Sequence, residues 1–283
     1  MAYDPRGQMN EVPPVPLPCL TLTAAERAEQ TIAQARVDAA AKEFHTHGFL
    51  LITDVLPLAL TEELRTAYLA EYAHLWNGPA VTDALKVGSK RYMVTVDIKK
   101  PFNTPLLYAN PFVLPLVKAL LTEELVLGTF VSVTSLPGAK LQHLHRDNPL
   151  LFNALINRFL PPHAVSVFFP LVEFNSVNGT TRLFPGTHLK NDADSKKVNP
   201  VDPVVPVGSC LLVDYRLFHQ GTENQSSTVR PMLCGVYQRP WFKDSRNYKL
   251  QPYLKISDAE YEAIPEMHRG MLKWIEHYRH GLY

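Results

Sequence analysis

The stretch Gln142-His143-Leu144-His145-Arg146-Asp147 lies between two β-rich runs, Leu125–Leu136 and Ala164–Phe169. In an extended backbone, residues two apart point to the same side. His145 and Asp147 can therefore offer a ring nitrogen and a carboxylate oxygen to one point in space. Taken alone, this His-x-Asp spacing is weakly specific, because such a pair also occurs on protein surfaces without a metal.

A second histidine in a suitable context is His219. The run Leu211–Asp214 is typical of a buried strand, and the chain leads from it to His219. Two histidines and one carboxylate form a facial triad that leaves coordination positions open, as in non-haem Fe(II) oxygenases. The candidate metal ligands are therefore His145, Asp147 and His219. The alternatives are His143 as a ligand in another register, and a polar network without metal.

Arg230 adds a third element. It lies near the start of a strand predicted over Met232–Tyr237, and an arginine there can form a bidentate pair with a carboxylate. An oxygenase that uses a keto acid needs such a cation, because the keto acid chelates iron at one end and its far carboxylate must be held at the other. A cupin-type zinc or manganese enzyme is the alternative, since His and Asp ligands alone do not fix the metal.

The middle of the chain is rich in short β runs separated by Pro, Gly and Asn turns. These runs are Tyr92–Ile98, Leu125–Leu136, Ala164–Phe169, Thr180–Phe184, Val207–Val213 and Met232–Tyr237. Short strands at such spacing predict a sandwich or barrel.

Helices are predicted on either side of this β-rich region. One begins after Thr23, which opens a capping-box pattern, and runs from about 24 to 46 until Gly48 ends it. A second is predicted to be capped by Thr61, and a last helical region follows Ser257. The sequence thus predicts a β core flanked by helices.

Composition narrows the classes of partner. The 283 residues carry 28 Lys+Arg against 27 Asp+Glu without a long basic block, so nucleic acid is not an expected partner. Neither an uncharged apolar run of about 18 residues nor a signal-peptide pattern occurs, so we expect no membrane span and no export. Three separated cysteines fit a reducing compartment, which we expect to be the cytoplasm.

We treat 1–283 as one domain in which the proline-rich residues 1–20 form an extended arm.

The sequence resembles the phytanoyl-CoA dioxygenase (PhyH) family of Fe(II)- and 2-oxoglutarate-dependent oxygenases over most of its length. The motifs that carry the resemblance are His47–Ile52, the His145/Asp147 pair, Asn178-Gly179, Pro185–His188, and His219 with Arg230. Within the family, Gln142-x-x-His145-Arg146-Asp147 and Phe169–Phe174 resemble the branch that acts on fungal alkaloids and meroterpenoids, which includes the fumitremorgin endoperoxidase.

The resemblance implies a mainly β fold with flanking helices, a double-stranded β-helix (jelly roll) with iron at one end. It implies Fe(II), 2-oxoglutarate and O2 as cofactor and cosubstrates, with Gln142 and Thr181 assisting Arg230 in binding 2-oxoglutarate. Halogenases of this chemistry carry a small residue in place of the carboxylate. Because Asp147 is intact, hydroxylation or a related C–H oxidation with release of succinate and CO2 is expected.

The substrate is inferred from apolar residues near these motifs. Residues 148–162 form an apolar, proline-bounded segment, which is either a lid over the substrate or a subunit contact in a homodimer. The candidate substrate residues are Tyr92, Phe152, Phe159 and Trp241. They predict a largely apolar small molecule, as in secondary metabolism. The alternatives are a non-catalytic jelly-roll protein that binds metal or 2-oxoglutarate, and an acyl-CoA hydroxylase, which the lack of a nearby basic cluster disfavours.

Overall fold

The structure is a computed structural model that describes residues 17–77, 85–248 and 250–275. Most of the arm predicted at 1–20 lies outside these ranges. The last residues of the predicted arm are not extended away from the core, which corrects the prediction. Cys19–Thr21 forms strand β1, which pairs in parallel with β2 (Phe49–Thr53), because Leu20 completes the core beside the first helices. Within the described ranges, none of the helices has the length and apolar character needed to cross a membrane.

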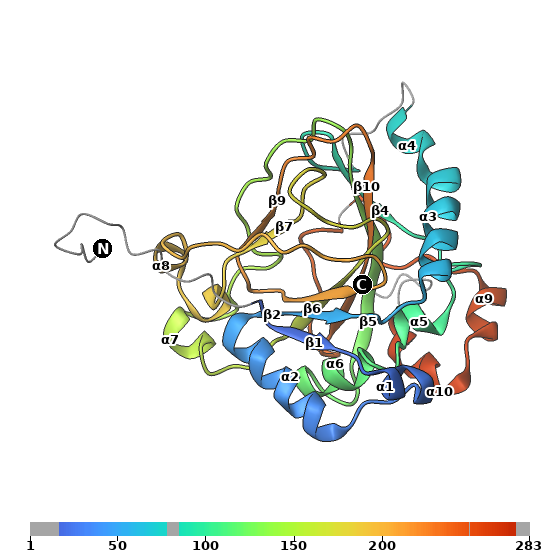
Figure 1. The fold of residues 1–283 in the computed structure, drawn as a ribbon. Helices are drawn as coiled ribbons and strands as arrows, with labels where there is room; N and C mark the ends of the chain where they lie inside the picture. The colour runs from blue at the N-terminus through green and yellow to red at the C-terminus, as the bar shows by residue number, and fades with distance from the viewer. Residues whose placement is uncertain (1–16, 78–84, 249, 276–283) are drawn as a thin grey trace.

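A large, mostly antiparallel sheet forms the centre of the molecule (Figure 1). Among the described residues it contains eight strands in the order β1-β2-β8-β6-β10-β5-β4-β3. The further bounds are β3 Lys86–Gly88, β4 Arg91–Thr95, β5 Val126–Ser135, β6 Ala164–Pro170, β8 Cys210–Asp214 and β10 Arg230–Gln238. The six predicted β runs are confirmed within a few residues, whereas β1, β3 and the short β9 were not predicted.

Both faces of this sheet are buried, and strand β2 shows how. Leu50 and Ile52 belong to the core that includes Phe44 of helix α2 (Gln34–His47). Phe49 and Leu51 point the other way, into a second core. Because side chains alternate along a strand, one apolar run serves both layers.

The second core is closed by a small sheet that carries part of the candidate site. Strand β7 (Thr181–Leu183) pairs antiparallel with β9 (His219–Gly221). Isolated bridges add His145 on the far side of β9 and Val201 beside β7. Two facing sheets with helices outside the larger one confirm the predicted mainly β jelly roll with flanking helices.

The helices lie mainly beside the larger sheet (Figure 1). The other helical segments are α1 Ala24–Glu29, α3 Leu58–Tyr72, α4 His74–Asn77, α5 Pro105–Tyr108, α6 Leu114–Leu120, α7 Ala154–Asn157, η2 Thr187–Leu189, α8 Asp192–Ser195, α9 Asp258–Ala263, α10 Glu266–Arg269 and η3 Gly270–Leu272. The capping box at Thr23 is confirmed, as is the cap at Ser257, whose side chain accepts from the Glu260 N–H.

Two helix predictions were wrong in detail. The single helix predicted over 24–46 is interrupted after α1, because Gln30 adopts a left-handed conformation and the β-branched Thr31 and Ile32 that follow favour extended backbone. Thr61 does not cap the second helix. It lies inside α3, and its hydroxyl donates to the Pro57 carbonyl one turn earlier.

A buried ion pair stabilises the turn between β8 and β9. Arg216 donates from Nε and Nη2 to the two carboxylate oxygens of Asp214 at 2.9 and 2.7 Å, and both side chains are at most 2% exposed. Burial alone would raise the pKa of Asp214, but the charge and hydrogen bonds of Arg216 hold that pKa below its usual value. This pair shapes the turn that leads to His219.

Asp214→Asn is expected to lower the free energy of unfolding by about 3–5 kcal/mol, because it leaves the Arg216 charge buried without compensation. Urea denaturation measures the loss. The matched control is Glu62→Gln, which breaks the exposed pair with Arg65 and should cost less than about 1 kcal/mol. Equal, small losses at both pairs would contradict a structural role for the buried one.

Candidate active site

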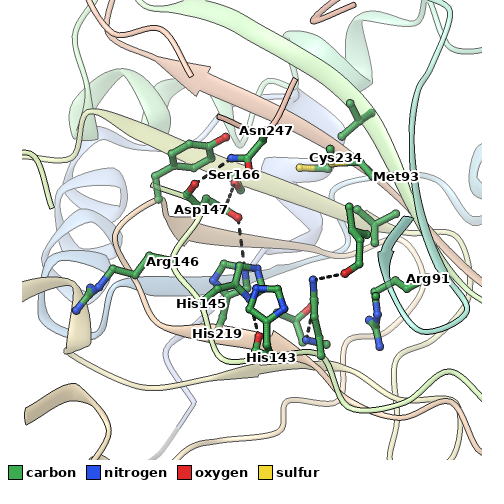
Figure 2. A pocket seen from close by; sticks show the side chains of 18 of the residues that line it. Arg91, Met93, His143, His145, Arg146, Asp147, Ser166, His219, Cys234 and Asn247 are labelled. Atoms are coloured by element: carbon green, nitrogen blue, oxygen red, sulfur yellow. Dashed lines mark hydrogen bonds and ion pairs between the residues drawn. The ribbon is translucent and has the colours of Figure 1, made fainter. Parts of the chain in front are cut away.

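Three metal-ligating side chains meet between the two sheets (Figure 2). His145 and His219 are held side by side by backbone hydrogen bonds in both directions, at 3.1 and 2.9 Å. Asp147 follows two residues after His145, and its Oδ1 lies 3.5 Å from Nε2 of His219. One ligand atom from each of the three lies within 4.8 Å of the others. The structure thus brings together the three predicted ligands, and His143 is not part of this cluster.

Backbone carbonyls orient both imidazole rings. Nδ1 of His145 donates to the His143 carbonyl at 2.9 Å, and Nδ1 of His219 donates to the Leu217 carbonyl at 3.0 Å. With Nδ1 protonated, Nε2 of each ring carries the free lone pair. Such outer hydrogen bonds select the tautomer and fix the ring plane of metal-binding histidines.

Burial favours the neutral forms of two groups in this cluster, His145 and Asp147. Desolvation and the neighbouring His219 lower the pKa of His145 to about 3, so its imidazole is an uncharged donor at neutral pH. Desolvation raises the pKa of Asp147, with His219 opposing the rise. The Asp147 carboxylate also accepts from the Ser166 hydroxyl at 3.2 Å. Two imidazole nitrogens and one carboxyl group converge, which is the donor set of a facial triad.

A cavity of about 770 Å³ opens beside the three ligands and extends to Arg230 at the start of β10. The Arg230 side chain is 3% exposed, and Nη2 donates to the Ser135 hydroxyl at 3.0 Å. Within the described part of the chain, Nε and Nη1 have no hydrogen-bond partner. Burial and the nearby charge of Arg91 lower the Arg230 pKa to about 9. Buried donors without partners are costly, so this guanidinium is suited to an anion that enters the cavity.

Arg91 is a second buried arginine of the cavity, and the sequence analysis missed it. It lies opposite Ser135 on one side of β5, as Arg230 does on the other. Its Nη2 donates to the Thr222 carbonyl at 2.8 Å, while Nε has no partner among the described residues. A Cβ on Gly221 would collide with this guanidinium, so glycine leaves the space that Arg91 fills. The sequence did contain an indication of its position. Side chains alternate along a strand, so Arg91 points to the same side as Met93, which also lines the cavity.

Gln142 and Thr181 both line the cavity. Gln142 accepts from the Gly221 N–H at 3.1 Å and donates to the Val87 carbonyl at 3.0 Å. Thr181 is 4% exposed and pairs with Gly221 in the small sheet. The structure therefore brings these two residues to the same side of the cavity as Arg91.

None of the four candidate substrate residues is among the described residues that line the cavity, so their contact with the substrate stays a prediction. Tyr92 faces the helical layer and stacks on Trp76, because only its neighbours Arg91 and Met93 have the strand parity that points inward. Phe152, Phe159 and Trp241 are 53, 80 and 65% exposed. Apolar composition alone did not indicate on which side of the chain these side chains lie.

Comparison with known proteins places the sequence in a family. A model of the phytanoyl-CoA dioxygenase (PhyH) family matches residues 44–232. The chain is 26% identical over 283 residues to Dioxygenase af480 of Aspergillus fumigatus, covering 94% of this chain and 85% of that protein.

Two solved structures show the same fold. AviO1 from Streptomyces viridochromogenes Tue57 has a TM-score of 0.58 at 20% identity and covers 74% of this chain and 98% of its own. HygX from Streptomyces hygroscopicus, solved with nickel, 2-oxoglutarate and hygromycin B, has a TM-score of 0.55 at 16% identity and covers 79% of this chain and 97% of its own. Because the family model spans most of the sequence, this chain belongs to the phytanoyl-CoA dioxygenase (PhyH) family of Fe(II)- and 2-oxoglutarate-dependent oxygenases.

Proposed function

We propose that this protein uses Fe(II), 2-oxoglutarate and O2 to oxidise a largely apolar small molecule, in secondary metabolism. The observation that carries the proposal is the set of residues that line one cavity. His145, Asp147 and His219 converge at one place, and the buried Arg230 lines the same cavity with two donor nitrogens that have no partner among the described residues. A divalent metal requires the first feature, and a dicarboxylate cosubstrate requires the second.

The residues present fit this metal and cosubstrate. His145 and His219 offer free Nε2 atoms and Asp147 offers a carboxylate, a set that occupies one face of Fe(II) and leaves positions for other ligands. When bound, Fe(II) and 2-oxoglutarate supply the oxidation: O2 and 2-oxoglutarate are consumed, succinate and CO2 leave, and one oxygen atom goes to the substrate.

The chain's own side chains bind, orient and exclude water. Arg230 would pair with the far carboxylate of 2-oxoglutarate through its free Nε and Nη1. Thr181, Gln142 and Arg91 lie along the same cavity and would complete the cosubstrate site. Ser166 holds one oxygen of Asp147 and so limits rotation of that carboxylate.

One part of the cavity wall, around Tyr215 and Tyr248, supports an apolar substrate, because the hydroxyls of these two tyrosines are bonded to protein. The Tyr215 hydroxyl donates to Asp244 at 2.7 Å, and the Tyr248 hydroxyl lies 3.1 Å from the Thr129 hydroxyl, so both hydroxyls of these cavity-lining tyrosines have protein partners. Apolar or weakly polar side chains that line the same cavity include Val131, Phe168, Cys234 and Val236. A wall of this kind selects by shape and apolar contact.

Anaerobic addition of Fe(II) and 2-oxoglutarate to the purified protein tests the proposal. It is expected to produce a weak visible metal-to-ligand charge-transfer band, because the keto acid chelates the iron. Mg(II) in place of Fe(II) is the control and should give no band. A folded protein without the band would contradict the proposal. A band without succinate formation under O2 would support the non-catalytic alternative, and turnover with acyl-CoA alone would support the acyl-CoA hydroxylase.

The partners that we propose are a small-molecule substrate and a second copy of the chain. Five apolar side chains of the 148–162 segment are 39 to 80% exposed, which suits either a homodimer contact or a lid that closes over the substrate. The described cysteines Cys19, Cys210 and Cys234 are free, which supports a reducing compartment such as the cytoplasm.

A further inference from the structure

We infer that Arg146 is a positioning residue that joins the two parts of the chain that carry the metal ligands. The inference rests on the proposed function, in which His145, Asp147 and His219 hold Fe(II). Arg146 lies between the first two ligands in sequence, yet its side chain points away from them (Figure 2). It is 5% exposed, so it is a buried cation beside the metal site.

The Arg146 guanidinium is hydrogen-bonded on all three nitrogens. Nη1 donates to the Thr187 carbonyl at 2.9 Å and to the Arg216 carbonyl, and Nη2 donates to the Lys190 carbonyl at 2.9 Å and the Ser195 hydroxyl at 3.0 Å. The bond from Nε to Asp192 is long, at 3.4 Å. Because Asp192 is 71% exposed, this ion pair contributes little. The carbonyls are therefore the partners that matter.

One of these hydrogen bonds and a further ring contact reach the segment that carries the third ligand. The Arg216 carbonyl, which accepts from Arg146, precedes the Leu217 carbonyl, which orients His219. The guanidinium also lies over the ring of Phe218, 4.1 Å from its centroid. Arg146 thus contacts the two residues on either side of the carbonyl that fixes the His219 ring.

Thr187 also connects Arg146 with the segment that carries His219. Its carbonyl accepts from Arg146, and its hydroxyl accepts from the Phe218 N–H at 2.9 Å. A planar fork with five donors can bind several carbonyls at once, whereas a lysine ammonium acts from one point. The position between His145 and Asp147 therefore requires arginine, and lysine would leave buried carbonyls without donors.

Metal affinity separates positioning from a merely structural role. We expect Arg146→Lys and Arg146→Met to weaken binding of Co(II) to the apoprotein by about 10- to 100-fold, the cost typical of losing a group that orients metal ligands. Titration followed by the visible d–d bands of Co(II) gives the affinity, and the band positions report the coordination geometry, which should change. The control is Arg239→Lys, because Arg239 is half-buried and donates to the Pro162 carbonyl at 2.9 Å. It should bind Co(II) like the wild type.

The outcomes are distinguishable from failure of the proposed function. A wild-type protein that does not bind Co(II) would refute the metal site itself. If the wild type binds Co(II) and a folded Arg146→Lys protein binds it equally well with unchanged bands, Arg146 is not a positioning residue. Should both Arg146 variants fail to fold, Phe218→Leu decides, since it removes the ring under Arg146 and keeps the backbone N–H that donates to Thr187. An affinity drop with a native circular dichroism spectrum supports the inference, and wild-type affinity overturns it.

Discussion

Asp147→Ala is expected to abolish metal-dependent turnover of 2-oxoglutarate. Asp147 is the one anionic donor of the cluster, and without it two neutral imidazoles remain to compete with water for a divalent ion. The loss of Fe(II) affinity should exceed the roughly 100-fold that a supporting residue costs when removed. Anaerobic Fe(II) titration measures the affinity, and succinate released from 2-oxoglutarate without added substrate measures the turnover.

His143→Ala is the matched control for this prediction. His143 lies two residues before His145, with ring centroids 4.9 Å apart, but its side chain is outside the ligand cluster. Its carbonyl, which orients His145, is retained in the variant. Fe(II) affinity should therefore stay within about threefold of the wild type. An Asp147→Ala protein that still binds Fe(II), or a His143→Ala protein that loses it, would show that the ligand set is wrong.

The ligand cluster could be predicted because its spacing is local. His145 and Asp147 are two residues apart, and His219 follows a recognisable buried run. The cavity could not be predicted in the same way, because it depends on register between distant strands. Arg91 and Arg230 become neighbours only when β4 and β10 pair on either side of β5 at Ser135.

The positions of the candidate substrate residues relative to the cavity also depend on tertiary contacts. Tyr92 stacks on Trp76 whereas its neighbours Arg91 and Met93 line the cavity, because a shift of one residue along a strand reverses the face to which a side chain points. In the 148–162 segment, Arg216 donates to the Leu160 carbonyl at 3.0 Å from inside the fold. The neighbouring Phe159 is left 80% exposed. Composition indicates that such a segment is apolar, but only tertiary contacts decide which of its groups turn inward.

Arg230→Met is expected to raise the KM for 2-oxoglutarate at least about 100-fold while Fe(II) affinity is retained. Methionine keeps an apolar stem of similar length but has no donor for the far carboxylate. Charge-assisted hydrogen bonds are worth about 1.5–3 kcal/mol each, and Nε and Nη1 are both free to make one. Initial-rate measurements of succinate formation at varied 2-oxoglutarate give the KM, and anaerobic titration gives the Fe(II) affinity.

The stability of the apoprotein provides a second readout for the same substitution. In the wild type the Arg230 charge is buried with two donor nitrogens that have no partner among the described residues, which costs folding free energy until an anion binds. Arg230→Met should therefore leave the Tm of the apoprotein unchanged or higher, and the rise in Tm that 2-oxoglutarate gives the wild type should disappear.

Arg182→Met is the control, because Arg182 is also on a strand beside the site but pairs with the exposed Asp202 at 2.7 and 2.6 Å. Its KM should stay near the wild-type value. An unchanged KM in Arg230→Met would remove Arg230 from the cosubstrate site. A higher KM together with a lower Fe(II) affinity and a lower Tm would instead mean that the arginine supports the fold. A higher KM with unchanged Fe(II) affinity and an unchanged or higher Tm therefore assigns the binding of an anion to Arg230. A buried cation whose role is to stabilise the fold would not be left with free donors.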